Sequence, residues 1–402
     1  MNRFRLAGLL PEILLGLLLV STGRNLGAAD AGAPAQPMSD IAPAKTLASA
    51  LSPEKWRQVE NSVDRGLAWL ASQQAEDGSF PSLATGQPGV TSLCVMAFLS
   101  RGHQPGAGPY GQQLNRAVDY VLSCQKDDGL ICHLAPEPQY VYMGASQTAT
   151  YNHAISGLML GEIYGSITGA RAKKVKKALS RALLYTRALQ IRPKRDATGA
   201  GGLRYVRAKP RAEDGSEQSD SDLSATAWHL MFLRSARNAE FNVPQRYVDD
   251  GVAYVRRCWD PKSSMFNYVV TANGGRGASR GTTGAGILSL SMAGEHNTPM
   301  ARAAGDWLVA HPYGEYDQTI GPYDRFFYSI YYSSQAAAQL GGHYWEKIFP
   351  PIVDVFLKIQ AADGSFPPET MESDTPFGST YTTAMAVLSM TPAYQLLPVY
   401  QR

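Results

Sequence analysis

One eight-residue segment occurs twice, close to the two ends of the chain. Gln-Ala-Glu-Asp-Gly-Ser-Phe-Pro at 74–81 returns as Gln-Ala-Ala-Asp-Gly-Ser-Phe-Pro at 360–367, with seven of eight positions identical. A third, weaker copy, Gln-Lys-Asp-Asp-Gly-Leu-Ile, occupies 125–131. A match of this length at this separation indicates internal duplication, so the sequence predicts a fold built from repeated units.

Each copy follows an amphipathic helical pattern and precedes a second helix of small and apolar residues. Apolar residues recur at helical spacing over 56–70 and again over 345–359. The glycine of each copy suits the left-handed conformation that ends a helix. We predict six helix pairs, with first helices at 53–74, 112–125, 170–190, 244–258, 298–310 and 345–360, and second helices at 89–101, 150–164, 222–239, 282–294, 323–340 and 378–391.

This alternation predicts two concentric rings of helices. The first helix of each pair has a polar face and belongs outside, whereas the second is apolar all round and belongs inside. We therefore predict an all-α fold, an (α/α)6 toroid of six helical hairpins, as one domain over residues 53–402. All inner helices then begin at one end, where unpaired N–H groups and partial positive charge make the default binding site.

The first 52 residues do not follow the repeat pattern. Two arginines precede a short apolar stretch over 13–20, and small residues follow up to Ala29. This order is typical of a signal peptide over residues 1–29, because the apolar part is too short to span a bilayer. An uncleaved membrane anchor is the alternative. We expect residues 30–52, rich in Ala and Pro, to form a tether, and the protein to be exported, periplasmic or extracellular.

Composition excludes several classes of protein. With 44% hydrophobic and 18% charged residues, the chain is not disordered, collagen-like or a coiled coil. The net charge of +3 falls to +1 without residues 1–29, so we expect no nucleic-acid partner. The basic run over 171–181 is either a solvated helix face or a surface for an anionic envelope partner.

The four cysteines are too few for a disulfide framework in a chain of this length. Cys124 and Cys132 are near enough in sequence to bridge a short loop, and we leave that pairing open. Cys94 lies in an apolar helical run, which favours a small buried side chain.

The Gln-x-x-Asp-Gly-Ser-Phe turn resembles the repeat of the squalene cyclase and protein prenyltransferase superfamily. The resemblance covers residues 53–391, and the C-terminal stretches 381–388 and 397–402 resemble the end of an exported bacterial subgroup of such toroids. It implies no particular activity for that subgroup. It does imply that the turn fastens helices together through Gln74, Phe80, Gln360 and Phe366, which are then not catalytic.

Within this superfamily, class II terpene cyclases protonate an alkene with an Asp-x-Asp-Asp-Thr-Ala-type motif. Asp220 and Asp222 match the first two aspartates of that motif, and Leu223 replaces the third. The resemblance makes Asp222 the candidate acid, with Asp220 beside it. The alternative, which we favour, is that Asp222 or Ser221 caps the helix that begins at Leu223.

The zinc prenyltransferases of the superfamily hold their metal with an Asp-x-Cys motif, and this sequence contains none. The adjacent Cys132 and His133 resemble part of the zinc site of lanthionine cyclases, which share the toroid. A second Cys ligand cannot be placed, so we expect no metal and no other cofactor.

The fifth inner helix is predicted to begin with many aromatic residues. Aromatic rings in a lumen can stabilise a cation, form a platform for sugars, or fill the space between the helix rings. Two histidines lie among apolar residues of the second and third inner helices, which is more typical of core positions than of a base. The candidate ligand-binding residues are Tyr323, Asp324, Phe327, Tyr328, Tyr331, His153 and His229.

The sequence therefore favours an exported toroid that binds a hydrophobic, isoprenoid-like or other envelope ligand in its central cavity, without the full catalytic motif of the superfamily. One alternative is an active terpene-cyclase-like enzyme with Asp222 as its acid. Another is a polysaccharide-acting enzyme with a glycan ligand, since (α/α)6 barrels also carry out sugar chemistry. The fold alone does not choose between them.

Overall fold

The computed structural model describes residues 45–136, 144–207, 220–371 and 374–401. The predicted signal peptide over 1–29 and most of the predicted tether lie outside the described residues. The last part of the tether segment contains the short helix α1 (Lys45–Ala48), which contacts α12. Leu47 is buried, and its carbonyl accepts a hydrogen bond of 2.8 Å from Trp345 Nε1.

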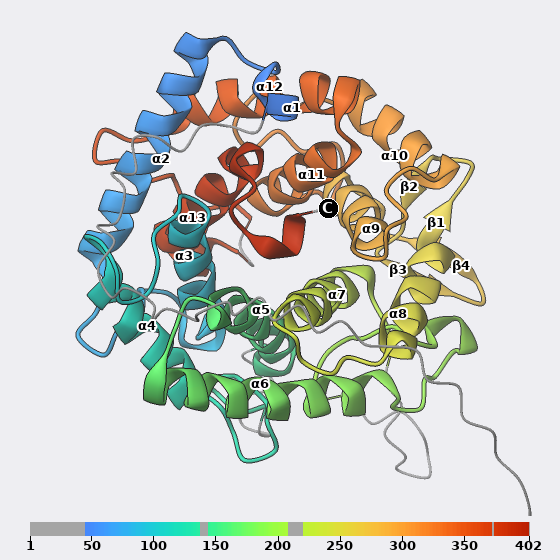
Figure 1. Cartoon of the computed structure of the whole chain (residues 1–402). Helices are drawn as coiled ribbons and strands as arrows, with labels where there is room; N and C mark the ends of the chain where they lie inside the picture. The colour runs from blue at the N-terminus through green and yellow to red at the C-terminus, as the bar shows by residue number, and fades with distance from the viewer. Residues whose placement is uncertain (1–44, 137–143, 208–219, 372–373, 402) are drawn as a thin grey trace, which may run out of the picture. The chain divides into compact units, whose positions relative to one another are not determined.

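Twelve longer helices alternate between an outer and an inner ring of the described chain (Figure 1). The outer helices are α2 (Pro53–Gln73), α4 (Gly111–Ser123), α6 (Gly169–Gln190), α8 (Gln245–Cys258), α10 (Pro299–Ala310) and α12 (Gly342–Ile359). The inner helices are α3 (Gly89–Leu99), α5 (Ala145–Tyr164), α7 (Leu223–Asn238), α9 (Arg280–Met292), α11 (Phe326–Leu340) and α13 (Gly378–Met390). Because α13 contacts α3, the inner ring is closed. The predicted (α/α)6 toroid is confirmed.

Short elements connect the rings. Two small antiparallel hairpins lie between α8 and α9: β1 (Trp259–Asp260) with β2 (Met265–Phe266), and β3 (Val269–Thr271) with β4 (Gly274–Arg276). Single 3₁₀ turns are η2 (Ala84–Gly86), η4 (Ala197–Gly199), η5 (Thr375–Phe377), η6 (Pro392–Tyr394) and η7 (Pro398–Tyr400). Across the described ranges, no helix is both long and apolar enough to cross a membrane.

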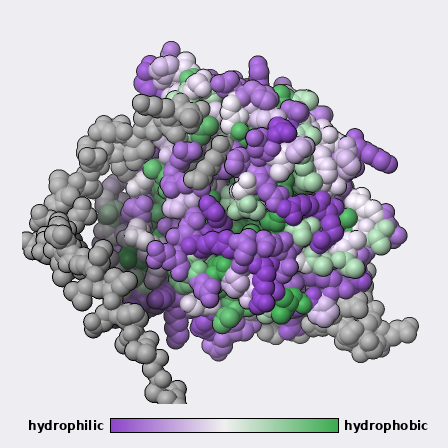
Figure 2. Space-filling model, turned by 45° about the vertical axis from the view of Figure 1, so that its right-hand side comes forward, coloured by the Kyte–Doolittle hydropathy of each residue, from purple (hydrophilic) through white to green (hydrophobic). Residues whose placement is uncertain are grey.

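The two rings differ in burial in the way their sequences predict. Every residue of α3 is buried, whereas α2 buries only one face, from Trp56 to Leu70. The surface over α8, α10 and the two hairpins is mostly hydrophilic, with apolar residues scattered over it (Figure 2). Small residues let the inner helices approach closely. A Cβ on Gly284 of α9 would lie 2.7 Å from the Tyr332 carbonyl carbon of α11.

The repeated glutamines tie outer helices to their neighbours. Gln74 Nε2 donates to the carbonyl of Gly78 in its own turn and to that of Gln113 in α4, at 3.0 and 2.8 Å. Gln360 makes the same pair of bonds to Gly364 and to Ser62 in α2, so it joins the last outer helix to the first. These contacts confirm the fastening role expected for the two glutamines.

Two features of this turn, its backbone conformation and its close approach to α2, require a glycine. Gly364 has a φ of +97°, and a Cβ there would lie 2.5 Å from the Arg65 carbonyl oxygen of α2. Only glycine accepts that backbone conformation and that close approach without strain. The turn can therefore lie directly against the neighbouring outer helix.

The C-terminal segment folds back into the ring, where the C-terminus lies near the centre of the view (Figure 1). Tyr400 is buried, and its carbonyl accepts a hydrogen bond of 2.7 Å from Gln339 of α11. Its hydroxyl bonds to that of Tyr331 on the same helix. This segment fills part of the lumen away from the inner-helix N-termini.

Candidate functional site

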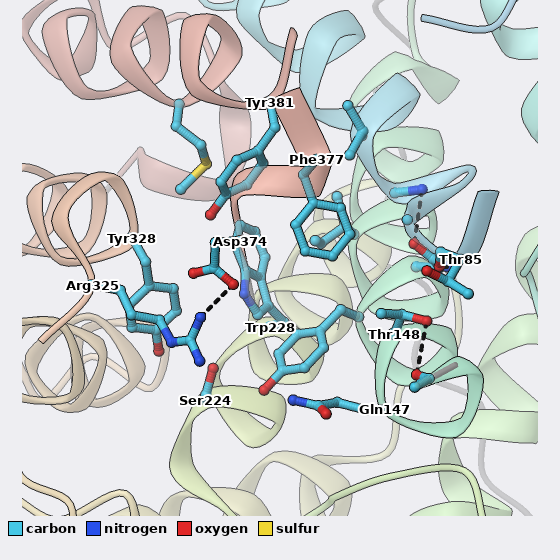
Figure 3. A pocket seen from close by; sticks show the side chains of 18 of the residues that line it. Thr85, Gln147, Thr148, Ser224, Trp228, Arg325, Tyr328, Asp374, Phe377 and Tyr381 are labelled. Carbon is cyan, nitrogen blue, oxygen red and sulfur yellow. Dashed lines mark hydrogen bonds and ion pairs between the residues drawn. The ribbon is translucent and has the colours of Figure 1, made fainter. Parts of the chain in front are cut away.

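A cavity of about 470 Å³ lies at the end of the toroid where the inner helices begin (Figure 3). All six inner helices contribute residues from their N-terminal halves or caps, which is the location predicted from the topology. Eight aromatic side chains line the cavity: Tyr151, Tyr205, Trp228, Tyr268, Tyr323, Tyr328, Phe377 and Tyr381.

An ion pair spans one side of the cavity. Arg325, the N-cap residue of α11, pairs with Asp374 from the segment before α13, and both line the cavity (Figure 3). Glu369 is buried nearby, where its Oε1 accepts a hydrogen bond of 2.7 Å from the Phe327 N–H. Burial raises the pKa of Glu369 to about 7, and the negative charge of Asp374 adds to that effect.

Asp222 is the N-cap of α7. Its Oδ1 accepts a hydrogen bond of 2.7 Å from the Ala225 N–H, the bond expected of a cap. The side chain is fully buried and does not line the cavity. Arg204 Nε lies 3.4 Å from its other oxygen. Burial raises the pKa of Asp222 to about 6, while Arg204 acts in the opposite direction.

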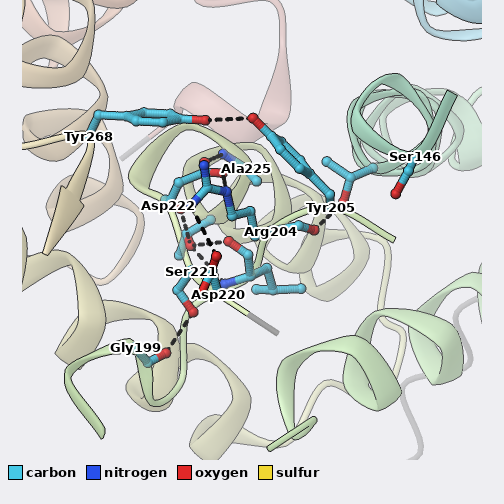
Figure 4. A network of polar contacts seen from close by, with 12 residues as sticks. Ser146, Gly199, Arg204, Tyr205, Asp220, Ser221, Asp222, Ala225 and Tyr268 are labelled. Atoms are coloured by element: carbon cyan, nitrogen blue, oxygen red, sulfur yellow. Dashed lines mark hydrogen bonds and ion pairs between the residues drawn. The ribbon is translucent and has the colours of Figure 1, made fainter. Parts of the chain in front are cut away.

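Asp220 belongs to the same polar network but also lies outside the cavity lining (Figure 4). Its Oδ2 pairs with Arg195 at 2.7 Å and with Arg204 at 3.7 Å. The structure therefore brings the two predicted aspartates together around one arginine. It places them behind the wall of the cavity.

Two tyrosines form that part of the wall. The hydroxyls of Tyr205 and Tyr268 lie 3.1 Å apart, and both residues line the cavity (Figure 4). The Arg204 guanidinium lies 4.9 Å from the centre of the Tyr205 ring and 5.7 Å from that of Tyr268. Neither residue could be predicted from the sequence, because both lie outside the helices, where no periodic pattern marks them.

The aromatic segment before and within α11 divides between cavity and core. Tyr323, with 58% of its surface exposed, and Tyr328 line the cavity. Phe327 and Tyr331 are fully buried and do not line it; the Tyr331 ring stacks on Trp228 with 5.4 Å between ring centres.

Asp324 is a structural residue in this fold. It is buried and forms an ion pair of 2.7 Å with Arg280 of α9, and its Oδ1 accepts a hydrogen bond of 2.6 Å from Ser329. It does not line the cavity. The expectation that Asp324 contacts a ligand finds no support in its position.

His153 occupies the position that a threonine, Thr91, occupies in the first copy of the repeat. The Phe80 N–H donates to Thr91 Oγ1 at 3.0 Å, and at the matching place the Ile131 N–H donates to His153 Nδ1 at 3.1 Å. The other ring nitrogen of His153 lies 3.0 Å from Thr186 Oγ1. Burial lowers the pKa of His153 to about 3.

His229 is also buried outside the cavity lining. Its Nδ1 lies 2.9 Å from the Ala225 carbonyl oxygen, and burial lowers the pKa of the ring to about 4. Both histidines are therefore neutral core residues at pH 7, and the structure places neither where it meets a ligand in this cavity.

The four cysteines are buried free thiols, including Cys124 and Cys132. Burial raises the pKa of Cys132 to about 12, while the adjacent His133 is exposed, so the two side chains face different surroundings. Within the part of the chain that the structure describes, no three His, Cys, Asp or Glu side chains gather as a metal site would require.

Several lining residues lie on the predicted inner helices but are not among the predicted ligand-binding residues. Tyr151, Trp228 and Tyr381 lie in the first two turns of α5, α7 and α13. The sequence was sufficient to predict these three residues, because the N-terminal turns of the inner helices were expected to surround the binding site.

No family model and no curated protein matches the sequence. Among solved structures, the α-1,6-mannanase GH76A of Salegentibacter sp. HEL1_6, in complex with α-1,6-mannotriose, is 9% identical with a TM-score of 0.55, over 84% of this chain and 99% of that one. A protein from Actinoplanes is 16% identical with a TM-score of 0.53, over 83% and 99%. The type II terpene cyclase MstE of Scytonema is 14% identical with a TM-score of 0.49, over 86% and 100%. The first two likenesses support the α/α toroid fold.

Proposed function

We propose that this protein binds a mainly apolar, isoprenoid-like ligand of the cell envelope in the cavity at the inner-helix N-termini. The observation that carries the proposal is the cavity itself, whose lining is rich in aromatic and aliphatic side chains. Its volume of about 470 Å³ lies within the range of small-molecule sites. The N-terminal sequence supports export as part of the same proposal.

The position of Asp222 favours binding without acid-initiated cyclisation. A general acid must come within hydrogen-bonding reach of the atom that it protonates. Asp222 is fully buried behind the cavity wall, and one of its oxygens is bonded to the α7 backbone. Leu223, at the third motif position, is also buried. We therefore infer that Asp222 stabilises the structure around the site and does not act as an acid on the ligand.

Titration calorimetry with the isoprenoid alcohol farnesol tests the proposal. Gln147 is an exposed residue on the first turn of α5 and lines the cavity, so Gln147→Trp should partly fill it. We expect saturable one-to-one binding that weakens at least tenfold in this variant. The matched control is Gln58→Trp, at an exposed position of outer helix α2, which should bind like the wild type.

α-1,6-Mannotriose, the ligand in the mannanase structure, serves as the second probe. Tyrosines at a cavity mouth also suit sugar rings, so the glycan alternative has a physical basis. Saturable mannotriose binding that Gln147→Trp removes, together with no farnesol binding, would replace the proposal by a glycan-binding function. Farnesol binding that Gln147→Trp leaves unchanged would place the ligand outside this cavity.

A further inference from the structure

The leucine, valine, isoleucine and methionine side chains of the cavity lining lie in one half of the inner ring. They all come from α3, the loop before it, α5 and α13, and are Leu83, Val90, Leu93, Ile155 and Met385. These helices are neighbours, since α3 contacts both α5 and α13. The opposite half, on α7, α9, α11 and their preceding loops, contributes seven of the hydroxyl-bearing lining residues, namely Tyr205, Ser224, Tyr268, Ser279, Thr282, Tyr323 and Tyr328, whereas the first half contributes four, namely Thr85, Thr148, Tyr151 and Tyr381.

The hydroxyl pair of Tyr205 and Tyr268 is the best-supported polar position in that half. The two oxygens lie 3.1 Å apart, so one phenol donates to the other. Arg204 holds the rings from behind through cation–π contacts and is itself fixed by Asp220 and Asp222. Burial, followed by the charge of Asp222, raises the pKa of Tyr268 far above its ordinary value, so this phenol keeps its proton.

We propose that the ligand is an amphiphilic alcohol whose hydroxyl binds the Tyr205–Tyr268 pair and whose hydrocarbon part lies against the α13–α3–α5 half. This inference rests on the proposed function and adds the chemical class and the orientation of the ligand. A hydroxyl both donates and accepts hydrogen bonds, so it matches the phenol pair in either arrangement of its protons. A ligand without a hydroxyl cannot both donate a hydrogen bond to the phenol pair and accept one from it.

Farnesol and its methyl ether separate this inference from simple apolar binding. We expect the wild type to bind farnesol five- to tenfold more tightly than farnesyl methyl ether, about the effect of one net hydrogen bond. Tyr268→Phe removes one hydroxyl and should abolish that preference, and Tyr205→Phe should do the same. The control is Tyr164→Phe, at the far end of α5 and outside the cavity lining, which should keep the preference.

The outcomes distinguish the two proposals. Equal affinity for farnesol and its ether, with both still excluded by Gln147→Trp, would overturn the alcohol inference and leave the proposed function standing. Absence of binding for both probes would overturn both. A preference that survives in both folded Phe variants, checked by their melting temperatures, would show that the hydroxyl binds elsewhere.

A separate observation concerns the outward face of α6. Lys173, Lys174, Lys176 and Lys177 are exposed and form no ion pair within the described chain. The arginines that flank them are used internally, since Arg171 pairs with Asp119 at 2.8 Å and Arg181 donates to the Lys126 carbonyl at 2.7 Å. The expected basic surface over 171–181 is thus narrowed to the four lysines.

Two apolar residues, Leu184 on α6 and Ile191 at its C-cap, extend this surface in the same direction. Leu184 is 72% exposed and Ile191 is 61% exposed, the highest values among the exposed large apolar residues of the described chain. They follow Lys173 by 11 and 18 residues, close to whole numbers of helical turns, so the three side chains point the same way. We define Lys173, Lys174, Lys176, Lys177, Leu184 and Ile191 as the α6 face.

We infer that the α6 face binds the surface of an anionic lipid bilayer. Lysines near a bilayer attract anionic headgroups, and exposed aliphatic side chains at an interface enter the headgroup region. An acidic protein surface would satisfy the lysines but would leave Leu184 and Ile191 in contact with polar groups. The combination therefore favours lipid.

Vesicle sedimentation tests this inference with the purified protein. Vesicles of phosphatidylcholine with one quarter phosphatidylglycerol should bind the protein at low salt, and pure phosphatidylcholine should not. Changing the four lysines to Gln should reduce binding at least tenfold, and Leu184→Ser with Ile191→Ser should reduce it several-fold. The control changes four exposed cationic residues elsewhere to Gln: Arg57, Lys262, Lys347 and Lys358. Equal loss in the control would show a non-specific charge effect and contradict the inference, as would no binding to either vesicle.

Discussion

Among single residues, Asp222 shows how a motif position can be retained in a supporting role. Its environment includes a helix N-terminus, the half-buried Arg204 and the phenol of Tyr268, and each of these favours a carboxylate without exposing it to a ligand. The sequence identified the residue and both of its possible roles. Only the burial of the side chain decides which role the geometry supports.

Substitutions of Asp222 separate the cap from the acid. Asn is a good cap and cannot donate a proton to a substrate, so Asp222→Asn should fold normally and should not lower the free energy of unfolding at pH 7. Asp222→Ala should cost about 1 kcal/mol, the usual cost of losing a cap. Urea unfolding of both variants provides the measurement. If Asp222→Asn instead abolished a measurable turnover while folding normally, Asp222 would be an acid after all.

The raised pKa of Asp222 predicts a specific pH dependence. The folded-state pKa of about 6 exceeds the ordinary value of 3.8, so between these pH values the folded chain holds a proton that the unfolded chain has released. The stability from this group is therefore full below about pH 4 and is lost as the pH rises through 6. Relative to Asp222→Asn, the wild type should lose unfolding free energy between pH 4 and pH 7. A relative gain over that range would show that the carboxylate is better stabilised when folded.

His153 provides a second test at this scale. Its ring accepts a backbone N–H where Thr91 does so in another repeat, so its role should be structural. His153→Ala leaves the Ile131 N–H unpaired and a void behind it, which should cost roughly 2–4 kcal/mol. His153→Thr should recover part of that loss. Ligand binding that fails in both variants at wild-type melting temperature would point to a direct role in the site.

Among the elements, helices and their fastening turns were predictable, and loop residues were not. Periodicity and the repeated turn located all twelve ring helices, because both signals are local in sequence. The turn between α6 and α7 was not predicted, because its glycine, Gly201, follows Gln190 by 11 residues and so does not match the spacing of the repeated turn. Gln190 nevertheless donates to the carbonyls of Gly201 and Tyr247, like the other fastening glutamines.

Similarly, the aromatic segment 323–332 was expected to begin a helix at Tyr323. The helix begins at Phe326 because Asp324 is held by Arg280 of the neighbouring helix, a contact between distant residues that no local pattern reveals. The two cavity tyrosines Tyr205 and Tyr268 were missed for the same reason.

Gln360→Ala tests the fastening turns at the point where the outer ring closes. The substitution leaves the Ser62 and Gly364 carbonyls without their side-chain donor, so we expect a loss of roughly 1–4 kcal/mol of unfolding free energy. Gln58→Ala, at an exposed position of α2, should stay within about 0.5 kcal/mol of the wild type. Thermal unfolding measures both. Equal melting temperatures for all three proteins would contradict the fastening role.

In the whole molecule, closure of the inner ring determines where a ligand can bind. One end gathers six helix N-termini around the cavity, and the chain's own C-terminal segment occupies part of the remaining lumen. This polarity follows from the repeated order of outer and inner helices, so the location of the cavity was predictable. The gathering of its aliphatic side chains in one half was not, because it depends on which side chains meet across the ring.

The most direct test of ligand binding in the cavity is photolabelling with a farnesol analogue that carries a diazirine on its hydrocarbon chain. Mass spectrometry of the digested protein should find the label on cavity residues of the aliphatic half, such as Leu93, Ile155 and Met385. Excess farnesol should prevent labelling, and Gln147→Trp should reduce it. Labelling confined to residues outside the cavity, or unaffected by excess farnesol, would contradict the account.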